Sequence, residues 1–238
     1  MYYGASGIPH FNVPARMLGT GIYTPGEAAV LLRERPRTVR RWAFGRLPVI
    51  KTDLPELEGQ VALTFVELIE LLYIRAFERA GLTWPAIRTA AEAAARLFGT
   101  DHPFALRQFY VDPGSVYAAI EEQDGSESLV QLAGHGQHVL AALVKPYLEQ
   151  LDFDADDVAS RWWPMGRMGG VVIDPLHAFG APLVEGAGIR AKVLSDAYHA
   201  ERAMHGDRAL ERVAWSYEVA PEHVKAALNF ETWLRKAA

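Results

Sequence analysis

The chain has 238 residues, of which 50% are apolar and 22% are charged, a composition typical of a folded globular protein. No apolar run reaches the roughly 18 residues needed to cross a bilayer, and no signal-peptide pattern opens the chain, so we expect no membrane insertion. The absence of cysteine excludes disulfides, thiolate zinc sites and cysteine nucleophiles, and it fits a cytoplasmic protein.

Charge is unevenly distributed along the chain, whose formal net charge is −5. Between Arg33 and Lys51 seven basic residues face one acidic residue, a local charge of +6. Between Asp112 and Asp157 ten acidic residues face one lysine, a local charge of −9. An anionic polymer would be attracted to the first segment and repelled by the second. A solvated helix face is the alternative explanation of the basic run.

The first predicted elements form a helical pair. Residues 1–22 are rich in glycine and proline and predict an arm or short strand. Thr24, Pro25 and Glu27 then form a capping-box pattern that predicts a helix start. Proline disfavours helical geometry in the residue before it, so the helix should break near Arg35 and restart at Arg37, ending at Gly45. Two short helices with a tight turn predict a helix-turn-helix whose second helix carries the arginines.

The next residues predict a small hairpin and two further helices. Residues 47–50 and 61–63 could pair as the wing of a winged helix. Apolar residues at helical spacing predict helices over 64–80 and 84–98, with Gly81 between them.

The middle of the chain predicts strands over 108–111, 115–120 and 129–132, then a helix over about 137–151 and an acidic segment over 152–157. Residues 161–163 and 171–173 look extended, and helices should follow over 189–204, 207–216 and 221–229. The predicted fold is mainly α with a small β-containing middle region, between an N-terminal winged helix-turn-helix and a C-terminal helix-turn-helix. The expected domains are 1–100, 101–170 and 171–238.

Residues 23–32 and 36–42, followed by the helix over 64–80, Gly81, Leu82 and Ile87, resemble the DNA-binding head of MerR-type regulators. The resemblance covers roughly residues 22–98. Two features depart from that family: no long dimerisation helix follows the head, and the lack of cysteine excludes the metal-sensing chemistry of MerR itself.

The C-terminal part resembles domain-of-unknown-function family 433, whose members resemble antitoxins encoded beside PIN-like ribonuclease toxins. The matching motifs lie between residues 171 and 233: Ile173-Asp174-Pro175, Phe179-Gly180-Ala181-Pro182, Gly186, Gly188-Ile189-Arg190, Val193, Ala214, Tyr217, Val219, Val224, Ala226-Ala227-Leu228 and Phe230. Together the two ends resemble the longer VapB-type antitoxins that combine both parts in one chain.

The predicted DNA-binding residues lie in and around the second helix. Arginine suits both bidentate contact to guanine and anchoring to phosphate. The candidates are Arg35, Arg37, Thr38, Arg40, Arg41 and Arg46.

The predicted toxin-binding residues lie between residues 161 and 168. A PIN-type nuclease binds a divalent metal among carboxylates, and an inserted arginine could neutralise them, while tryptophan and methionine would supply apolar anchors. The candidates are Arg161, Trp162, Trp163, Met165 and Arg167. The alternative is a hairpin whose tryptophans belong to the core. The acidic run over 152–157 could imitate phosphate on the toxin, although a solvated loop is the simpler interpretation.

Other motifs predict no chemistry. His135 and His138 could share a metal, but no third ligand is evident, so a loop at a helix start is favoured. Gly186-Ala187-Gly188 is interpreted as a backbone turn. No nucleophile elbow or zinc-hydrolase histidine pair is found, so we expect no enzyme activity, metal or cofactor.

The resemblance therefore implies an antitoxin that neutralises a PIN-domain (VapC-like) endoribonuclease toxin and represses its own operon by binding promoter DNA as a homodimer. The alternative is a MerR-like regulator that senses a small ligand in the middle region and has no toxin partner.

Overall fold

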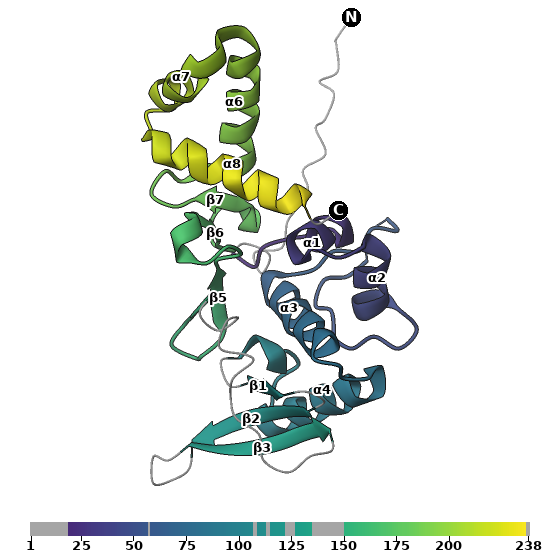
Figure 1. Ribbon diagram of the computed structural model, residues 1–238. Coiled ribbons are helices and arrows are strands. Elements are labelled where there is room, and N and C mark those ends of the chain that lie inside the picture. The colour runs from purple at the N-terminus through teal and green to yellow at the C-terminus, as the bar shows by residue number, and fades with distance from the viewer. Residues whose placement is uncertain are drawn as a thin grey trace, which may run out of the picture.

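Figure 1 shows the computed structural model, which describes residues 19–56, 58–106, 109–112, 115–121, 127–134 and 150–236. For the strands between residues 109 and 134 the description is of the backbone. The observed architecture is mainly α with antiparallel β-strands in the middle, as predicted. None of the described helices has the length and hydropathy that a bilayer crossing requires.

Four helices form the first part of the fold: α1 (Pro25–Leu32), α2 (Pro36–Phe44), α3 (Phe65–Arg79) and α4 (Trp84–Phe98). Thr24 with Glu27, and Thr64 with Glu67, make complete capping boxes that begin α1 and α3. Arg33 adopts a left-handed conformation (φ 56°) and ends α1, as the sequence predicts for the residues before Pro36. The helical boundaries expected for this part are confirmed to within a few residues.

The predicted hairpin wing is wrong. Residues 47–50 form no strand, and the Val49 amide donates to the Trp42 carbonyl at 2.9 Å instead. Leu63 pairs with Tyr23 in an antiparallel bridge, with both N–H···O distances 2.8 Å. The backbone groups of Leu63 are therefore already used, and Pro48 lacks the N–H that a ladder would need.

A short 3₁₀ turn (Pro103–Ala105) leads to a three-stranded antiparallel sheet of β1 (Phe109–Asp112), β2 (Ser115–Glu121) and β3 (Glu127–Gly134). All three strands were predicted, and β3 packs beside α4. The helix predicted over 137–151 and the pair His135 and His138 lie outside the described residues, except at the helix's predicted end. There the prediction is wrong, because Leu151 begins a strand.

A second antiparallel sheet has the order β4 (Leu151–Phe153), β5 (Ala159–Trp162), β6 (Val171–Ile173), β7 (Pro182–Val184) and β8 (Ile189–Arg190). The expected boundary at residue 171 falls between β5 and β6. Short 3₁₀ turns occupy Arg167–Gly169 and Ala178–Gly180. Gly186 and Gly188 both have positive φ in the turn between β7 and β8, so the predicted backbone turn is confirmed.

Three helices complete the chain: α6 (Ala191–His205), α7 (Ala209–Ser216) and α8 (Pro221–Arg235), with a 3₁₀ turn over Gly206–Arg208. The last helix is longer than the predicted 221–229. In Figure 1 α6, α7 and α8 form a separate layer, and the end of α8 approaches α1.

A small set of contacts joins the first helices to the C-terminal part of the chain. The Tyr23 hydroxyl donates to the Gly180 carbonyl at 3.0 Å, and the Ile22 amide donates to the Phe179 carbonyl at 3.2 Å. The Arg33 guanidinium lies 4.9 Å from the centre of the Trp233 ring on α8. The first helices and the second sheet therefore share one continuous core.

Candidate functional site

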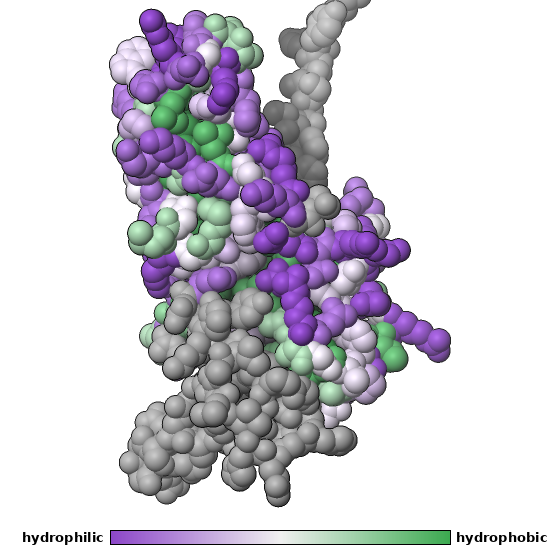
Figure 2. All heavy atoms as spheres, viewed as in Figure 1, coloured by the Kyte–Doolittle hydropathy of each residue, from purple (hydrophilic) through white to green (hydrophobic). Residues whose placement is uncertain are grey.

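Helix α2 presents an arginine-rich face to solvent. Arg37, Arg40 and Arg41 are exposed and occupy positions i, i+3 and i+4, so they share one side of the helix. Arg35 before the helix and Arg46 after it are also exposed, and Thr38 is half-buried. The sequence-predicted DNA-binding residues are thus brought together on one surface. Hydrophilic side chains project from the edge of the molecule over α1 and α2 in Figure 2.

The opposite side of α2 is anchored in the core. Val39 and Trp42 are fully buried, and the Trp42 ring centre lies 5.8 Å from that of Trp84 on α4. The Arg75 guanidinium on α3 donates to the Leu32 carbonyl and so supports the end of α1. Gly45 follows the helix in an extended conformation, and a side chain is not accommodated there because a Cβ would lie 2.5 Å from the Arg41 carbonyl oxygen. A rigid base therefore carries the arginine face.

Sequence analysis missed one arginine of this surface. A hollow of about 260 Å³ beside the end of α2 is lined by Arg41, Arg46 and Arg88, together with Trp84. The Arg41 guanidinium stacks over Trp84 at 5.1 Å and lies 3.8 Å from a carboxylate oxygen of Glu78. Arg88 is on α4, so only the packing of α4 against α2 reveals it. The hollow is cationic, with an aromatic wall.

The predicted toxin-binding tryptophans are core residues. Trp162 and Trp163 are 1% and 2% exposed. Trp162 ends β5 and packs into the main core, while Trp163 packs with Val172 and Leu183. They cannot serve as surface anchors in this fold, which favours the alternative of a buried hairpin. The physical reason is that both side chains face the interior of the fold, Trp162 the main core and Trp163 side chains of β6 and β7.

The two arginines of this segment are about half exposed, and each is paired. Arg161 Nε lies 3.1 Å from Asp174 Oδ2. Arg167 forms an ion pair with Asp152 and stacks 5.2 Å above the Trp163 ring. Met165 packs against the core, whereas Met168 is fully exposed. Arg161 and Arg167 are the accessible residues of the predicted site, and Met168, which was not among the candidates, is exposed next to Arg167.

The acidic segment over 152–157 has structural roles. Asp152 Oδ2 accepts from the Trp163 indole N–H at 3.2 Å, and Asp152 also pairs with Arg167. Asp154 Oδ1 accepts from the amides of Asp156 and Val158 at 3.0 and 2.9 Å. Asp154 thus fixes the turn between β4 and β5, and Asp152 links β4 to the segment that follows β5.

A cluster of titratable groups lies along α3, which carries two of its members, Glu67 and Glu70. His102 Nδ1 lies 2.9 Å from Glu70 and its Nε2 lies 3.0 Å from Asp53, while Glu67 accepts from the amides of Asp53 and Thr64 at 2.5 and 2.9 Å. Burial opposes protonation of His102, but its hydrogen bond to Glu70 and the charges of Glu70 and Asp53 outweigh burial and raise its pKa to about 9. Burial raises the pKa of the Glu67 and Glu70 carboxyls.

Asp53, Glu67 and His102 place one ligand atom each within 4.8 Å of the others, a spacing that a metal ion would accept. These atoms already hydrogen-bond to one another or to backbone amides, and Glu70 completes the pairing. The geometry is that of an ion-pair network joining α3 to the turn after α4.

Comparison with known proteins shows to which family the chain belongs. No family model matches it. A protein of Mycobacterium tuberculosis named "Putative antitoxin VapB45" is 30% identical over 240 residues, which cover 92% of this chain and 94% of that protein. The X-ray crystal structure of Rv2018 from Mycobacterium tuberculosis has the same fold, with a TM-score of 0.62 at 23% identity over 89% of this chain and 98% of that chain. On the first of these matches, the chain belongs to the family of VapB-type antitoxins.

Proposed function

We propose that this protein is an antitoxin that binds and neutralises a PIN-domain endoribonuclease toxin and represses its own operon by binding promoter DNA. It would act in the cytoplasm as a homodimer and have no catalytic activity of its own. The identity to an antitoxin over nearly the whole chain supports the antitoxin role. The arginine face of α2 supports the DNA-binding role.

The α2 face is the observation on which the DNA-binding proposal rests. Its arginines are exposed on a helix whose other side is buried. They can therefore approach a groove of DNA without any local unfolding of the protein. Arg40 and Arg37 would reach base edges, and Arg41, Arg46 and Arg88 would contact phosphates beside them. We interpret α1 and α2 as a helix-turn-helix of the MerR type, and α7 and α8 as a second such pair of the family-433 type.

The C-terminal helices are better suited to protein contact than to DNA. Residues 207–236 contain five acidic and five basic residues, so they have no net charge. Trp215 on α7 is 84% exposed, and exposed tryptophan is typical of protein interfaces. We assign toxin or partner-subunit binding to this part, together with Arg167 and Met168.

Binding to a DNA fragment upstream of the gene, followed by fluorescence anisotropy, tests the DNA-binding proposal. Arg37→Ala and Arg40→Ala should each weaken binding by about tenfold and lower the slope of log Kd against log salt by about 1. Arg96→Ala, which removes an exposed arginine at the far end of α4, is the matched control. Wild-type affinity in both α2 variants would contradict the assignment.

A further inference from the structure

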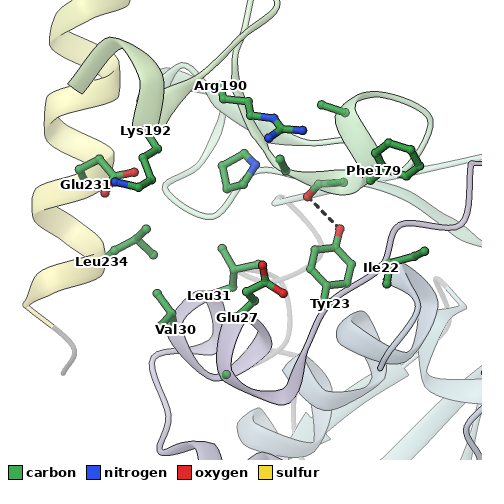
Figure 3. Close-up of a pocket in the computed structure, with 15 residues that line it drawn as sticks. Ile22, Tyr23, Glu27, Val30, Leu31, Phe179, Arg190, Lys192, Glu231 and Leu234 are labelled. Atoms are coloured by element: carbon green, nitrogen blue, oxygen red, sulfur yellow. Dashed lines mark hydrogen bonds between the residues drawn. The ribbon is translucent and has the colours of Figure 1, made fainter. Parts of the chain in front are cut away.

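A cavity of about 570 Å³ lies where the two ends of the chain meet. Figure 3 shows its walls, which come from α1, from the turn before β7, and from α6 and α8. The apolar lining includes Ile22, Val30, Leu31, Phe179, Pro182 and Leu234. This size suits a small molecule, and small-molecule sites are frequent at junctions between structural units.

Three of the four charged groups at the cavity have a partner within the protein. Lys192 Nζ lies 2.8 and 3.1 Å from the two carboxylate oxygens of Asp196, and Glu231 is close enough to Lys192 for their charges to offset each other. A Glu27 oxygen accepts from the amide and hydroxyl of Thr24, both at 2.8 Å.

Arg190 is the exception. Its guanidinium makes no hydrogen bond or ion pair with the residues that the structure describes, whereas its backbone pairs with Leu183 in the second sheet. Figure 3 shows its guanidinium at the edge of the cavity opposite α1, where Val30, Leu31 and the Glu27 carboxylate form the facing wall. The site therefore offers a guanidinium without an ion-pair partner among the described residues, next to an apolar volume whose other walls include the Glu27 and Glu231 carboxylates.

We propose that this cavity binds a small organic anion, with an apolar body against α1 and α8 and an acidic group on the Arg190 guanidinium. An arginine that is not neutralised by the protein favours a carboxylate, sulfonate or phosphate over a cation. The apolar walls contribute affinity by excluding water from the rest of the ligand.

The bound anion would join the two ends of the chain, since α1 precedes the arginine face and α6 and α8 belong to the C-terminal part. Binding to the folded state alone raises stability by mass action, so a ligand should raise the unfolding temperature. This proposal does not depend on DNA or toxin binding and is tested without either.

Fluorescence titration with anilinonaphthalene sulfonate, an apolar dye with one sulfonate, tests the proposal on the full chain. N-phenylnaphthylamine, the same ring system without the sulfonate, is the neutral comparison. Arg190→Gln should weaken binding of the sulfonate dye at least fivefold, a change of the order expected for a lost charged hydrogen bond, and leave the neutral dye within about twofold. Val30→Gln, at a half-exposed wall position, should weaken binding of both dyes.

Arg96→Gln and Arg212→Gln are the controls. Arg212 lines a second hollow with the exposed Trp215, so it reports dye bound there instead. The proposal is overturned if the wild type binds no dye, if Arg190→Gln binds the sulfonate dye like the wild type, or if Arg212→Gln causes the loss. It is also overturned if binding strengthens on dilution, since a second copy of the chain would then be the occupant.

Discussion

At the scale of single residues, charged side chains differ in whether they have a partner within the protein. Arg75 is 7% exposed and donates to the end of α1, Arg161 and Arg167 pair with aspartates, and His102 lies between two carboxylates. The arginines of α2 differ, because they extend into solvent and only Arg41 has a carboxylate nearby among the described residues. Helix α2 thus gathers several exposed arginines side by side.

The His102 cluster makes stability depend on pH. Its folded-state pKa of about 9 lies above the ordinary value of 6.5, so the folded state binds this proton more tightly than the unfolded state. The stabilisation is complete below about pH 6.5 and is lost as pH rises toward 9. We expect the free energy of unfolding of His102→Gln to be about 2 kcal/mol lower than that of the wild type at pH 6, after allowance for solvent screening. At pH 9.5 the difference should be less than about 1 kcal/mol.

Urea unfolding at pH 6, 7.5 and 9.5 measures this difference. His199→Gln, which removes an exposed histidine of α6, is the control and should show no such trend. A difference between His102→Gln and the wild type that is constant with pH would show that the histidine contributes packing but not its charge.

At the scale of elements, the helices of the first part were predictable because their signals are local. Capping boxes, Pro25, Pro36 and the apolar spacing of α3 fix helix starts and buried faces within a few residues of sequence. The wing was not predictable, because Leu63 pairs with Tyr23, which lies farther back along the chain than the expected partner segment over 47–50. The burial of Trp162 and Trp163 also depends on distant strands, so the same residues could suggest either a surface anchor or a core.

The turn between β5 and β6 is the element where toxin contact is predicted. Met168 is fully exposed there, so its replacement should not affect folding. We expect Met168→Glu to weaken toxin binding by about tenfold, since an interface methionine would be replaced by a charge that must be desolvated. Surface plasmon resonance with the purified toxin gives the affinity.

Leu47→Glu provides the comparison, because Leu47 is another exposed apolar residue, 66% exposed, on the first part of the chain. It should leave toxin binding unchanged. Equal losses in the two variants would indicate a general effect of charge, and no loss in Met168→Glu would remove this turn from the interface.

At the scale of the whole molecule, the Tyr23–Gly180 contact joins the two ends. Gly180 has φ 79°, and a Cβ there would lie 2.0 Å from the Tyr23 hydroxyl oxygen. Gly180→Ala should therefore destabilise the fold by about 2–4 kcal/mol through collision and backbone strain. Tyr23→Phe should cost about 1 kcal/mol by removing the hydrogen bond.

The double variant tests whether the loss of stability comes from the contact between Tyr23 and Gly180 or from an unrelated destabilisation of the fold. Tyr23→Phe removes the hydroxyl that an alanine would strike, so Gly180→Ala should cost less in that background than in the wild type. Thermal and urea unfolding of all four proteins gives the coupling. Strict additivity would mean that the two residues do not restrain each other.

Co-expression of the chain with the neighbouring open reading frame, followed by affinity purification and mass spectrometry, tests the central claim most directly. The antitoxin assignment predicts a stable complex that elutes as one species and lacks the ribonuclease activity of the free toxin. Recovery of the chain alone, with the nuclease fully active in its presence, would contradict it.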